Sequence, residues 1–137
     1  MYRIHGGSFD SGSASASGLS GSRIAQEGNI IVVVIQYRLG VLGYLPPSSA
    51  PSAKDPNLGV GDVVLALRWL RNAAKDFGGD GGRVVLGGQS SGAHMIRGKS
   101  VSQVGVTLMI ALWATPAARG FFRGAILQSD TMVRAYL

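Results

Sequence analysis

The hydrophobic residues of this sequence form several short continuous runs and one longer helical stripe. Residues 30–35 are all β-branched, and shorter apolar runs occupy residues 83–87 and 124–128. A strand that is covered on both faces needs such an unbroken run, because its side chains point alternately to the two faces. We therefore predict buried strands at these three places and a short strand over residues 1–5.

One amphipathic helix is predicted over residues 62–77. Apolar residues recur there at helical spacing, and charged or polar residues take the other side. Asp62 suits the helix start, and the pair Gly78-Gly79 suits its end. The predicted buried stripe consists of Val63, Ala66, Leu67, Leu70, Ala73, Ala74 and Phe77.

The order of these elements indicates an α/β protein. Strands that alternate with helices predict a doubly wound, mostly parallel sheet, and a further helix is expected after Ser90. The 137 residues are enough for one domain of ordinary size. Hydrophobic residues make up 46% and charged residues 15% of the chain, which fits a buried parallel sheet better than a helical bundle.

The charge and the residue types exclude several classes of function. The net charge is +6, but Lys and Arg are scattered, so we interpret the charge as favouring solubility and expect no nucleic-acid partner. With no cysteine and only two histidines, neither a disulfide nor a metal site is expected. Residues 1–5 lack the apolar segment of a signal peptide, and no apolar run approaches the ~18 residues of a membrane span. No cofactor is implied, and the localisation stays open.

A candidate nucleophile follows the predicted strand at residues 83–87. Residues 88–92 read Gly-Gln-Ser-Ser-Gly and fit the pattern G-x-S-x-G, with Ser90 at its centre. A serine on a very sharp strand-to-helix turn needs small residues two positions before and two after it, so that strand and helix can approach. The turn would expose the Ser90 hydroxyl, and the helix N-terminus would favour negative charge beside it.

A second motif follows the first predicted strand. Residues 5–9 read His-Gly-Gly-Ser-Phe, and the backbone N–H groups of such a glycine-rich loop can point inward without obstruction. The tetrahedral intermediate of acyl transfer carries an oxyanion that needs two or three fixed N–H donors. We predict that Gly7, Ser8 and Ser91 supply these donors.

Both motifs belong to a longer pattern along nearly the whole chain, which resembles the type-B carboxylesterases, the group that also contains cholinesterases and fungal lipases. This resemblance implies an α/β-hydrolase fold, of which residues 1–137 would be an incomplete central part without the N-terminal strands and the C-terminal half. The matching segments are residues 4–9, 37–40, 43–44, 57–59, Asp62, 66–69, 77–80, 88–92 and 120–129.

The resemblance implies hydrolysis of a carboxylic ester, in a small molecule or a lipid, through an acyl-enzyme on Ser90. In this family the triad acid and the triad histidine lie well downstream of the serine, beyond the position of Leu137. Glu usually precedes the serine; Gln89 stands there in this sequence, which removes a negative charge. The resemblance also suggests a buried ion pair between Arg38 and Asp62.

The missing triad members leave a second interpretation, a non-catalytic fragment or pseudoenzyme. The two histidines present are poor substitutes for the base. His5 opens the glycine loop and is expected to hold it, and His94 follows Ser90 by about one helical turn.

Residues 93–100 raise a minor alternative, because they resemble a relaxed phosphate-binding loop of an NTPase. Ala93 replaces the first glycine of that motif, and the segment does not start at the end of a strand. The Gly-Lys-Ser at residues 98–100 has another explanation. The chain is roughly a dozen residues longer here than the family pattern, and Gly-Lys-Ser can be encoded by GGTAAGTC, which contains a splice-donor consensus. We therefore predict that residues 98–109 are an insertion or a retained intron.

Overall fold

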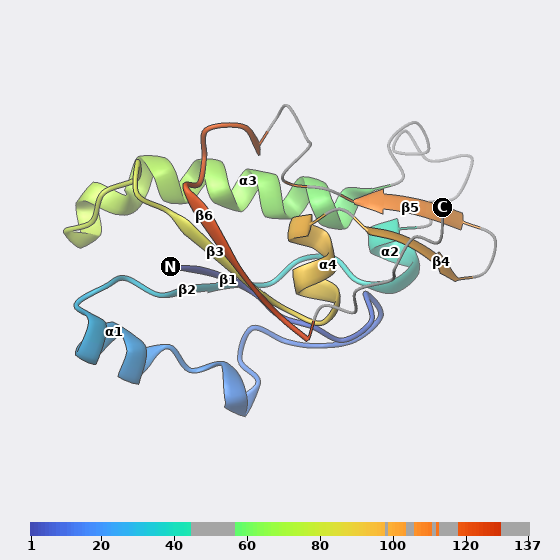
Figure 1. Ribbon diagram of the computed structural model, residues 1–137, viewed down its shortest axis with the longest axis horizontal. Coiled ribbons are helices and arrows are strands. Elements are labelled where there is room, and N and C mark those ends of the chain that lie inside the picture. Colours follow the sequence, from blue (N-terminus) through green and yellow to red (C-terminus); the bar gives the residue numbers. More distant parts are fainter. Residues whose placement is uncertain (45–56, 98, 104–105, 111, 113–117, 130–137) are drawn as a thin grey trace, which may run out of the picture.

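The computed structural model of the chain describes residues 1–44, 57–97, 99–103, 106–110, 112 and 118–129. Its centre is a four-stranded parallel sheet in the order β2-β1-β3-β6 (Figure 1). The strands are β1 (Tyr2–Ile4), β2 (Val33–Ile35), β3 (Val85–Gln89) and β6 (Gly124–Gln128). The predicted α/β class with a parallel sheet is therefore confirmed.

The register of the sheet places its most hydrophobic positions side by side in the centre. Tyr2 pairs with Val33 on one side and with Leu86 on the other, and Tyr2, Ile4 and Leu86 are fully buried. The strand predicted over residues 30–35 is shorter than expected, because it is paired only from Val33 onward. Since β2 is an edge strand, Ile30 is exposed rather than covered.

The main helix covers one side of this sheet. It runs as α3 (Leu58–Ala73) and tightens into the 3-10 helix η3 (Ala74–Phe77), which Gly78 ends with a φ of 76°. The tighter winding shifts the last side chain away from the sheet, so Phe77 is 63% exposed and its predicted burial is wrong. Most of the remaining predicted stripe is confirmed as core: Val63, Leu67, Leu70 and Ala74 are buried.

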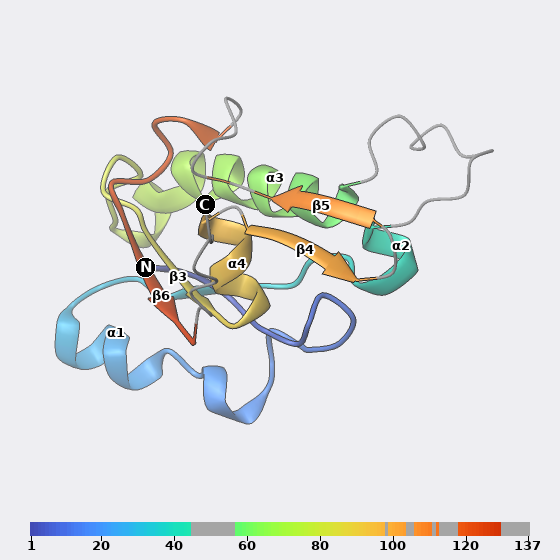
Figure 2. The same cartoon turned by 45° about the vertical axis from the view of Figure 1, so that its right-hand side comes forward.

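The smaller helices surround the ends of the strands. Helix α1 (Ser22–Gly28) lies on the opposite side of the strands from α3 in both ribbon views (Figures 1 and 2). Helix α2 (Gly40–Tyr44) packs on α3, and a single 3-10 turn, η1, spans Ser17–Leu19. Helix α4 (Ser91–Arg97) contacts both β3 and β6.

Two further strands form a separate pair beyond the end of α4 (Figure 2). Strands β4 (Lys99–Gln103) and β5 (Val106–Ile110) pair antiparallel, with Lys99 opposite Ile110. In the part of the chain that the structure describes, they pair with each other and with no strand of the parallel sheet. This pair coincides closely with residues 98–109; that these residues are an insertion stays a prediction.

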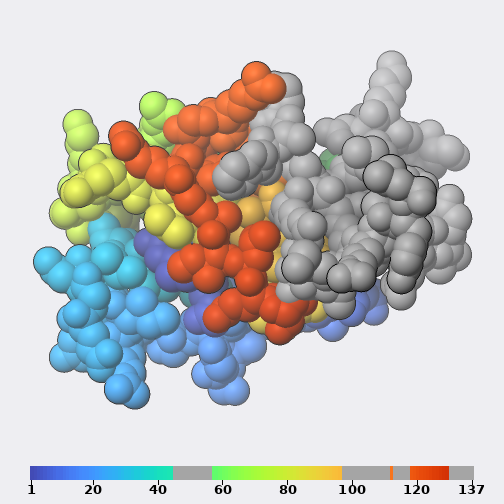
Figure 3. Space-filling model, in the orientation of Figure 1, coloured from blue at the N-terminus to red at the C-terminus, as the bar shows by residue number. Residues whose placement is uncertain are grey.

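Strand β6 forms one edge of the sheet. The orange-red atoms that contain this strand cross the visible face of the molecule without cover (Figure 3). Ile126 is 47% and Leu127 is 38% exposed, although both belong to an apolar strand.

Candidate active site

Ser90 occupies the sharp corner between β3 and α4, as the sequence pattern predicts. Its φ of 52° lies in the left-handed region, which non-glycine residues rarely adopt and which clusters at functional sites. Its N–H donates to the Gln128 carbonyl at 2.9 Å, and its own carbonyl accepts from the His94 N–H at 3.0 Å. These two bonds fix the backbone of the corner to β6 on one side and to α4 on the other.

The flanking glycines allow this corner to form because neither position has room for a side chain. A Cβ on Gly88 would lie 2.5 Å from the Gly92 carbonyl oxygen, and one on Gly92 would lie 2.4 Å from the Ile4 carbonyl oxygen. Both distances are far below van der Waals contact, and the opposing atoms belong to the backbone. The steric reason for glycine at these two positions of the motif is confirmed.

The glycine loop after β1 lies directly against the corner. A Cβ on Gly6 would come within 3.1 Å of the Ser90 Cβ. The backbone then turns through three successive residues with positive φ, namely 123° at Gly7, 55° at Ser8 and 66° at Phe9. The structure therefore brings the loop and Ser90 together, although they are more than 80 residues apart in sequence.

The expected oxyanion donors differ in their surroundings. Ser8 is exposed, Gly7 is half-buried and Ser91 is buried at the first position of α4. Within the described residues, the N–H groups of Gly7 and Ser8 donate no hydrogen bond, whereas the Gly7 carbonyl accepts from Asp10 and Ser11 at 3.0 Å each. The loop is thus held through the Gly7 carbonyl, while the N–H groups of Gly7 and Ser8 donate to no described residue.

His5 and Tyr37 form the base of the loop. The Nδ1 of His5 lies 2.8 Å from the Gly6 carbonyl oxygen, and the His5 ring stacks on Tyr37 with 4.6 Å between centroids. The Tyr37 hydroxyl donates to the His5 carbonyl at 2.8 Å. The expected structural role of His5 in holding the loop is supported. Nothing local in the sequence indicates this contact of Tyr37 with a residue 32 positions away.

Comparison with known proteins decides the family. The family model described as the carboxylesterase family matches residues 1–137. The chain belongs to the carboxylesterase family. It is 42% identical over 126 residues to the probable N-octanoylanthranilate hydrolase AqdA2 of Rhodococcus erythropolis, covering 92% of this chain and 24% of that protein. It is 41% identical over 129 residues to the para-nitrobenzyl esterase of Bacillus subtilis, covering 94% of this chain and 24% of that protein.

The fold of this carboxylesterase-family chain agrees with solved structures. The carboxylesterase EST55 of Geobacillus stearothermophilus, crystallised at pH 6.8, matches with a TM-score of 0.80 at 35% identity. That match covers 95% of this chain and 26% of the solved chain. The α/β-hydrolase fold is thereby confirmed, and the chain spans about a quarter of the length of the curated relatives it matches.

The expected ion pair between Arg38 and Asp62 forms in this chain. The Arg38 Nη2 and Nε lie 2.7 and 2.8 Å from the two Asp62 oxygens, and the Arg38 backbone N–H donates to the same carboxylate at 2.9 Å. Burial would raise the pKa of Asp62, but these hydrogen bonds and the Arg38 charge outweigh it and lower that pKa. The pair is not buried, however, since the side chains are 50% and 23% exposed, so that part of the prediction is wrong.

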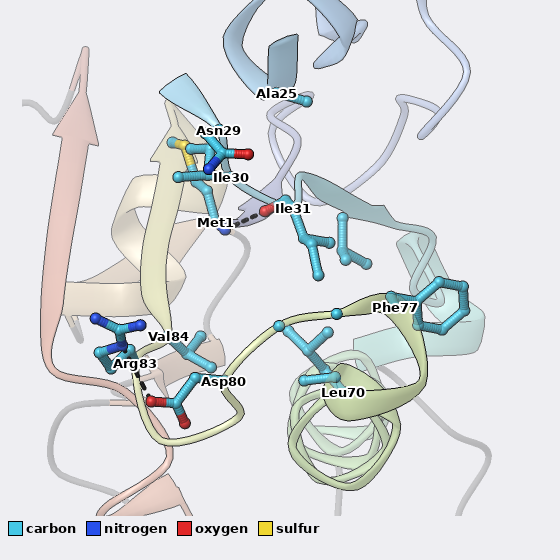
Figure 4. Close-up of a pocket in the computed structure, with 14 residues that line it drawn as sticks. Met1, Ala25, Asn29, Ile30, Ile31, Leu70, Phe77, Asp80, Arg83 and Val84 are labelled. Atoms are coloured by element: carbon cyan, nitrogen blue, oxygen red, sulfur yellow. Dashed lines mark hydrogen bonds and ion pairs between the residues drawn. The ribbon is translucent and has the colours of Figure 1, made fainter. Parts of the chain in front are cut away.

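One cavity of this carboxylesterase-family chain lies away from Ser90. It measures about 750 Å³ and is lined by residues that precede the strands, such as Met1 and Val84, and by the end of the main helix at Leu70 and Phe77 (Figure 4). An ion pair of Asp80 and Arg83, 3.0 Å apart, stands at its rim. Ligands of open α/β sheets bind at the carboxyl ends of the strands, where Ser90 lies, and not at this amino end.

Residues 93–100 of this family member do not have the geometry of a phosphate-binding loop. Ala93–Arg97 belong to helix α4, and Lys99 and Ser100 begin strand β4, so the described part of this segment is not a loop. Among the described residues there is also no cluster of three or more side chains that could hold a metal ion. No described helix is long and apolar enough to cross a membrane.

Proposed function

We propose that this chain carries the nucleophile and the oxyanion donors of a carboxylic ester hydrolase that acts through an acyl-enzyme. The observation that supports this most directly is the contact between the strained Ser90 corner and the glycine loop of residues 6–8. A half-buried serine hydroxyl, brought next to loop N–H groups that have no acceptor among the described residues, is the arrangement that acyl transfer requires.

The proposed reaction has two halves. The Ser90 Oγ attacks the ester carbonyl carbon and its proton passes to a base, while the N–H groups of Gly7, Ser8 and Ser91 hold the oxyanion. The intermediate collapses and the C–O bond to the alcohol breaks. The base returns its proton to that oxygen, so the neutral alcohol leaves and the acyl group stays on Ser90. Water then attacks this acyl group, which releases the acid and restores the hydroxyl.

The base and its acid partner are proposed to lie outside this chain. His5 is buried and stacks on Tyr37, and its Nδ1 lies 2.8 Å from the Gly6 carbonyl oxygen, so it is placed to hold the loop, although its buried Nε2 has no partner among the described residues. His94 lies one turn along α4 from Ser90. We therefore propose that the chain alone acylates slowly, and that multiple turnover needs a histidine from the remainder of an esterase fold.

The test is labelling of Ser90 by a fluorophosphonate or by p-nitrophenyl acetate, followed by mass spectrometry of the peptide. Modification of Ser90 that disappears in Ser90→Ala supports the proposal. Modification spread over other serines, such as the matched neighbour Ser91, contradicts it.

The second candidate is a non-catalytic fragment or pseudoenzyme of the family, and the placement of His5, buried and stacked on Tyr37 where it holds the loop, favours it. A turnover assay with a short-chain aryl ester separates the two. Without a base, oxyanion donors and binding alone give at most roughly 10³–10⁴-fold acceleration over water. Turnover at rates typical of an enzyme, abolished by Ser90→Ala, would contradict the proposed absence of a base and make His94 the first candidate for that role.

A further inference from the structure

We propose that the outer face of the main helix docks on an anionic lipid surface. This face belongs to α3 and η3 and points away from the parallel sheet, whose side of the helix is buried. Its members are exposed apolar or cationic side chains, which we call the outer patch: Leu65, Arg68, Trp69, Lys75 and Phe77. The inference does not depend on the reaction proposed at Ser90, because the patch and Ser90 lie on different elements.

The apolar part of the outer patch consists of large side chains that the fold leaves uncovered. Leu65 is 66%, Trp69 is 55% and Phe77 is 63% exposed. Leu65 and Trp69 are four residues apart in α3 and are therefore neighbours on its surface. The Trp69 ring lies 6.4 Å from the Phe77 ring, measured between the centroids. The three side chains thus form one patch, and clustered exposed apolar side chains mark interaction sites.

The cations of the outer patch indicate the charge of its partner. Arg68 and Lys75 are seven residues apart, so they lie on the same side of the helix, beside the apolar side chains. Neither forms an ion pair with a described residue. The acids of α3 and η3 are Asp62, which Arg38 neutralises, and Asp76, which is exposed.

A third cation shifts the balance of charge further. Arg71 is exposed, and its guanidinium lies over the Phe121 ring at 5.3 Å from the centroid. The two helices therefore carry three exposed cations and, apart from the paired Asp62, one acid. The whole chain has a net charge of +6. Both the local and the overall charge thus attract an anionic partner.

A lipid surface fits this combination of side chains. A helix that lies in a membrane interface buries Trp, Phe and Leu at the boundary between headgroups and acyl chains, with Lys and Arg beside the headgroups. The 16 residues of α3 and the four of η3 run lengthwise along one side of the molecule in both ribbon views (Figures 1 and 2). Since no described helix can span a membrane, the contact is docking on the surface.

The experiment measures binding of the 137-residue chain to vesicles of phosphatidylglycerol and phosphatidylcholine, and to vesicles of phosphatidylcholine alone. All proteins carry Trp113→Phe, so that Trp69 is the single tryptophan. The Trp69 emission should shift to the blue as the ring enters the headgroup boundary, and a titration gives the partition coefficient. We expect anionic vesicles to bind about tenfold more strongly or better, and salt to weaken this binding. Equal binding to both vesicles, or none, would overturn the proposal.

The role of the cations is tested by Arg68→Gln against Arg23→Gln. Both changes remove one exposed positive charge, but Arg23 belongs to α1, on the opposite side of the strands. Arg68→Gln should weaken binding to the anionic vesicles about fivefold, and Arg23→Gln less than about twofold. Equal losses in the two variants would show that only the overall charge matters and would refute docking through the outer patch.

The apolar side chains are tested by a pair of double variants. Leu65→Ser with Phe77→Ser should weaken binding about tenfold or more, because two apolar contacts with the lipid are lost. Val41→Ser with Leu42→Ser is the matched control, since both residues are exposed on α2, and it should change binding less than about twofold. Equal effects of the two double variants would contradict the proposal.

Sedimentation without vesicles distinguishes lipid from a second copy of the chain as the occupant of the outer patch. We expect a monomer in the unaltered chain and in each variant. A dimer that Leu65→Ser with Phe77→Ser dissociates would assign the patch to a second copy and overturn the proposal.

Discussion

Replacement of Gly92 by alanine should destabilise the chain, although alanine normally favours a helix. Gly92 is the second residue of α4, and a Cβ there would lie 2.4 Å from the Ile4 carbonyl oxygen and 2.8 Å from that of His5. Both opposing atoms belong to the backbone, at the end of β1 and the start of the loop. No side-chain rotation can relieve the contact, so strand and helix must separate.

The expected magnitude follows from two opposing effects. Overpacking a well-packed site costs about 1–3 kcal/mol, and replacing glycine by alanine in a helix gains up to about 1 kcal/mol. We expect Gly92→Ala to lose about 1–2 kcal/mol of unfolding free energy. Gly61→Ala is the matched control, because Gly61 lies in α3 with no atom within 4 Å of its added Cβ. It should gain about 0.5–1 kcal/mol.

Urea denaturation of both variants measures this difference, and a thermal scan should separate their midpoints by roughly 8 °C, at about 4 °C per kcal/mol. Acylation of Ser90 should also slow in Gly92→Ala, because the forced separation moves the corner. If Gly92→Ala were as stable as Gly61→Ala, the close approach of β1 and α4 would not exist, and the steric explanation of the motif would be refuted.

Three further predictions concern other parts of the chain. The pKa of the Asp62 carboxyl is lowered from its usual 3.8, so its stabilising effect is present above about pH 4 and is lost as the pH falls through the lowered pKa. Asp62→Asn should therefore weaken the loss of unfolding free energy at acid pH. An unchanged loss at acid pH would contradict the pairing with Arg38. The Tyr44 hydroxyl is buried with no hydrogen-bond partner among the described residues, so Tyr44→Phe should leave urea stability equal or slightly higher, and a loss above about 1 kcal/mol would reveal a missed partner. A chain without residues 98–109 should keep the circular dichroism spectrum of the folded protein. If these residues are a retained intron, sequenced cDNA should lack their codons. A spliced transcript that retains all of the codons would refute the intron hypothesis.

The parts of the site that local steric rules determine could be predicted from the sequence. Glycine at residues 88 and 92 around a serine indicates one sharp corner, because few other backbones need small residues at that spacing. The loop after β1 could likewise be located, since consecutive glycines follow an apolar strand. In both cases the glycines themselves mark a backbone that must lie free of side chains, even though Gly92 meets the backbone of Ile4, which is far away in the sequence.

Features that depend on distant neighbours were predicted poorly. The periodic pattern of the main helix extends to Phe77, but it does not reveal that the last turn tightens and rotates this ring outward. The pairing of Arg38 with Asp62 could be inferred from family resemblance, but its exposure depends on what packs above it. The hydrogen bond from the Tyr37 hydroxyl to the His5 carbonyl spans 32 residues, and no short pattern encodes it.

The bond from the Ser90 N–H to the Gln128 carbonyl continues the hydrogen-bonded ladder between β3 and β6 by one step past the last paired residues. The strained serine is therefore held at the end of a strand pairing, and its φ of 52° depends on a residue 38 positions downstream. A shorter chain that stops before Gln128 would keep the whole G-x-S-x-G sequence and lose an acceptor for the serine amide. The smallest piece of this protein that can present Ser90 in its observed conformation thus extends through β6, far beyond the five residues of the motif.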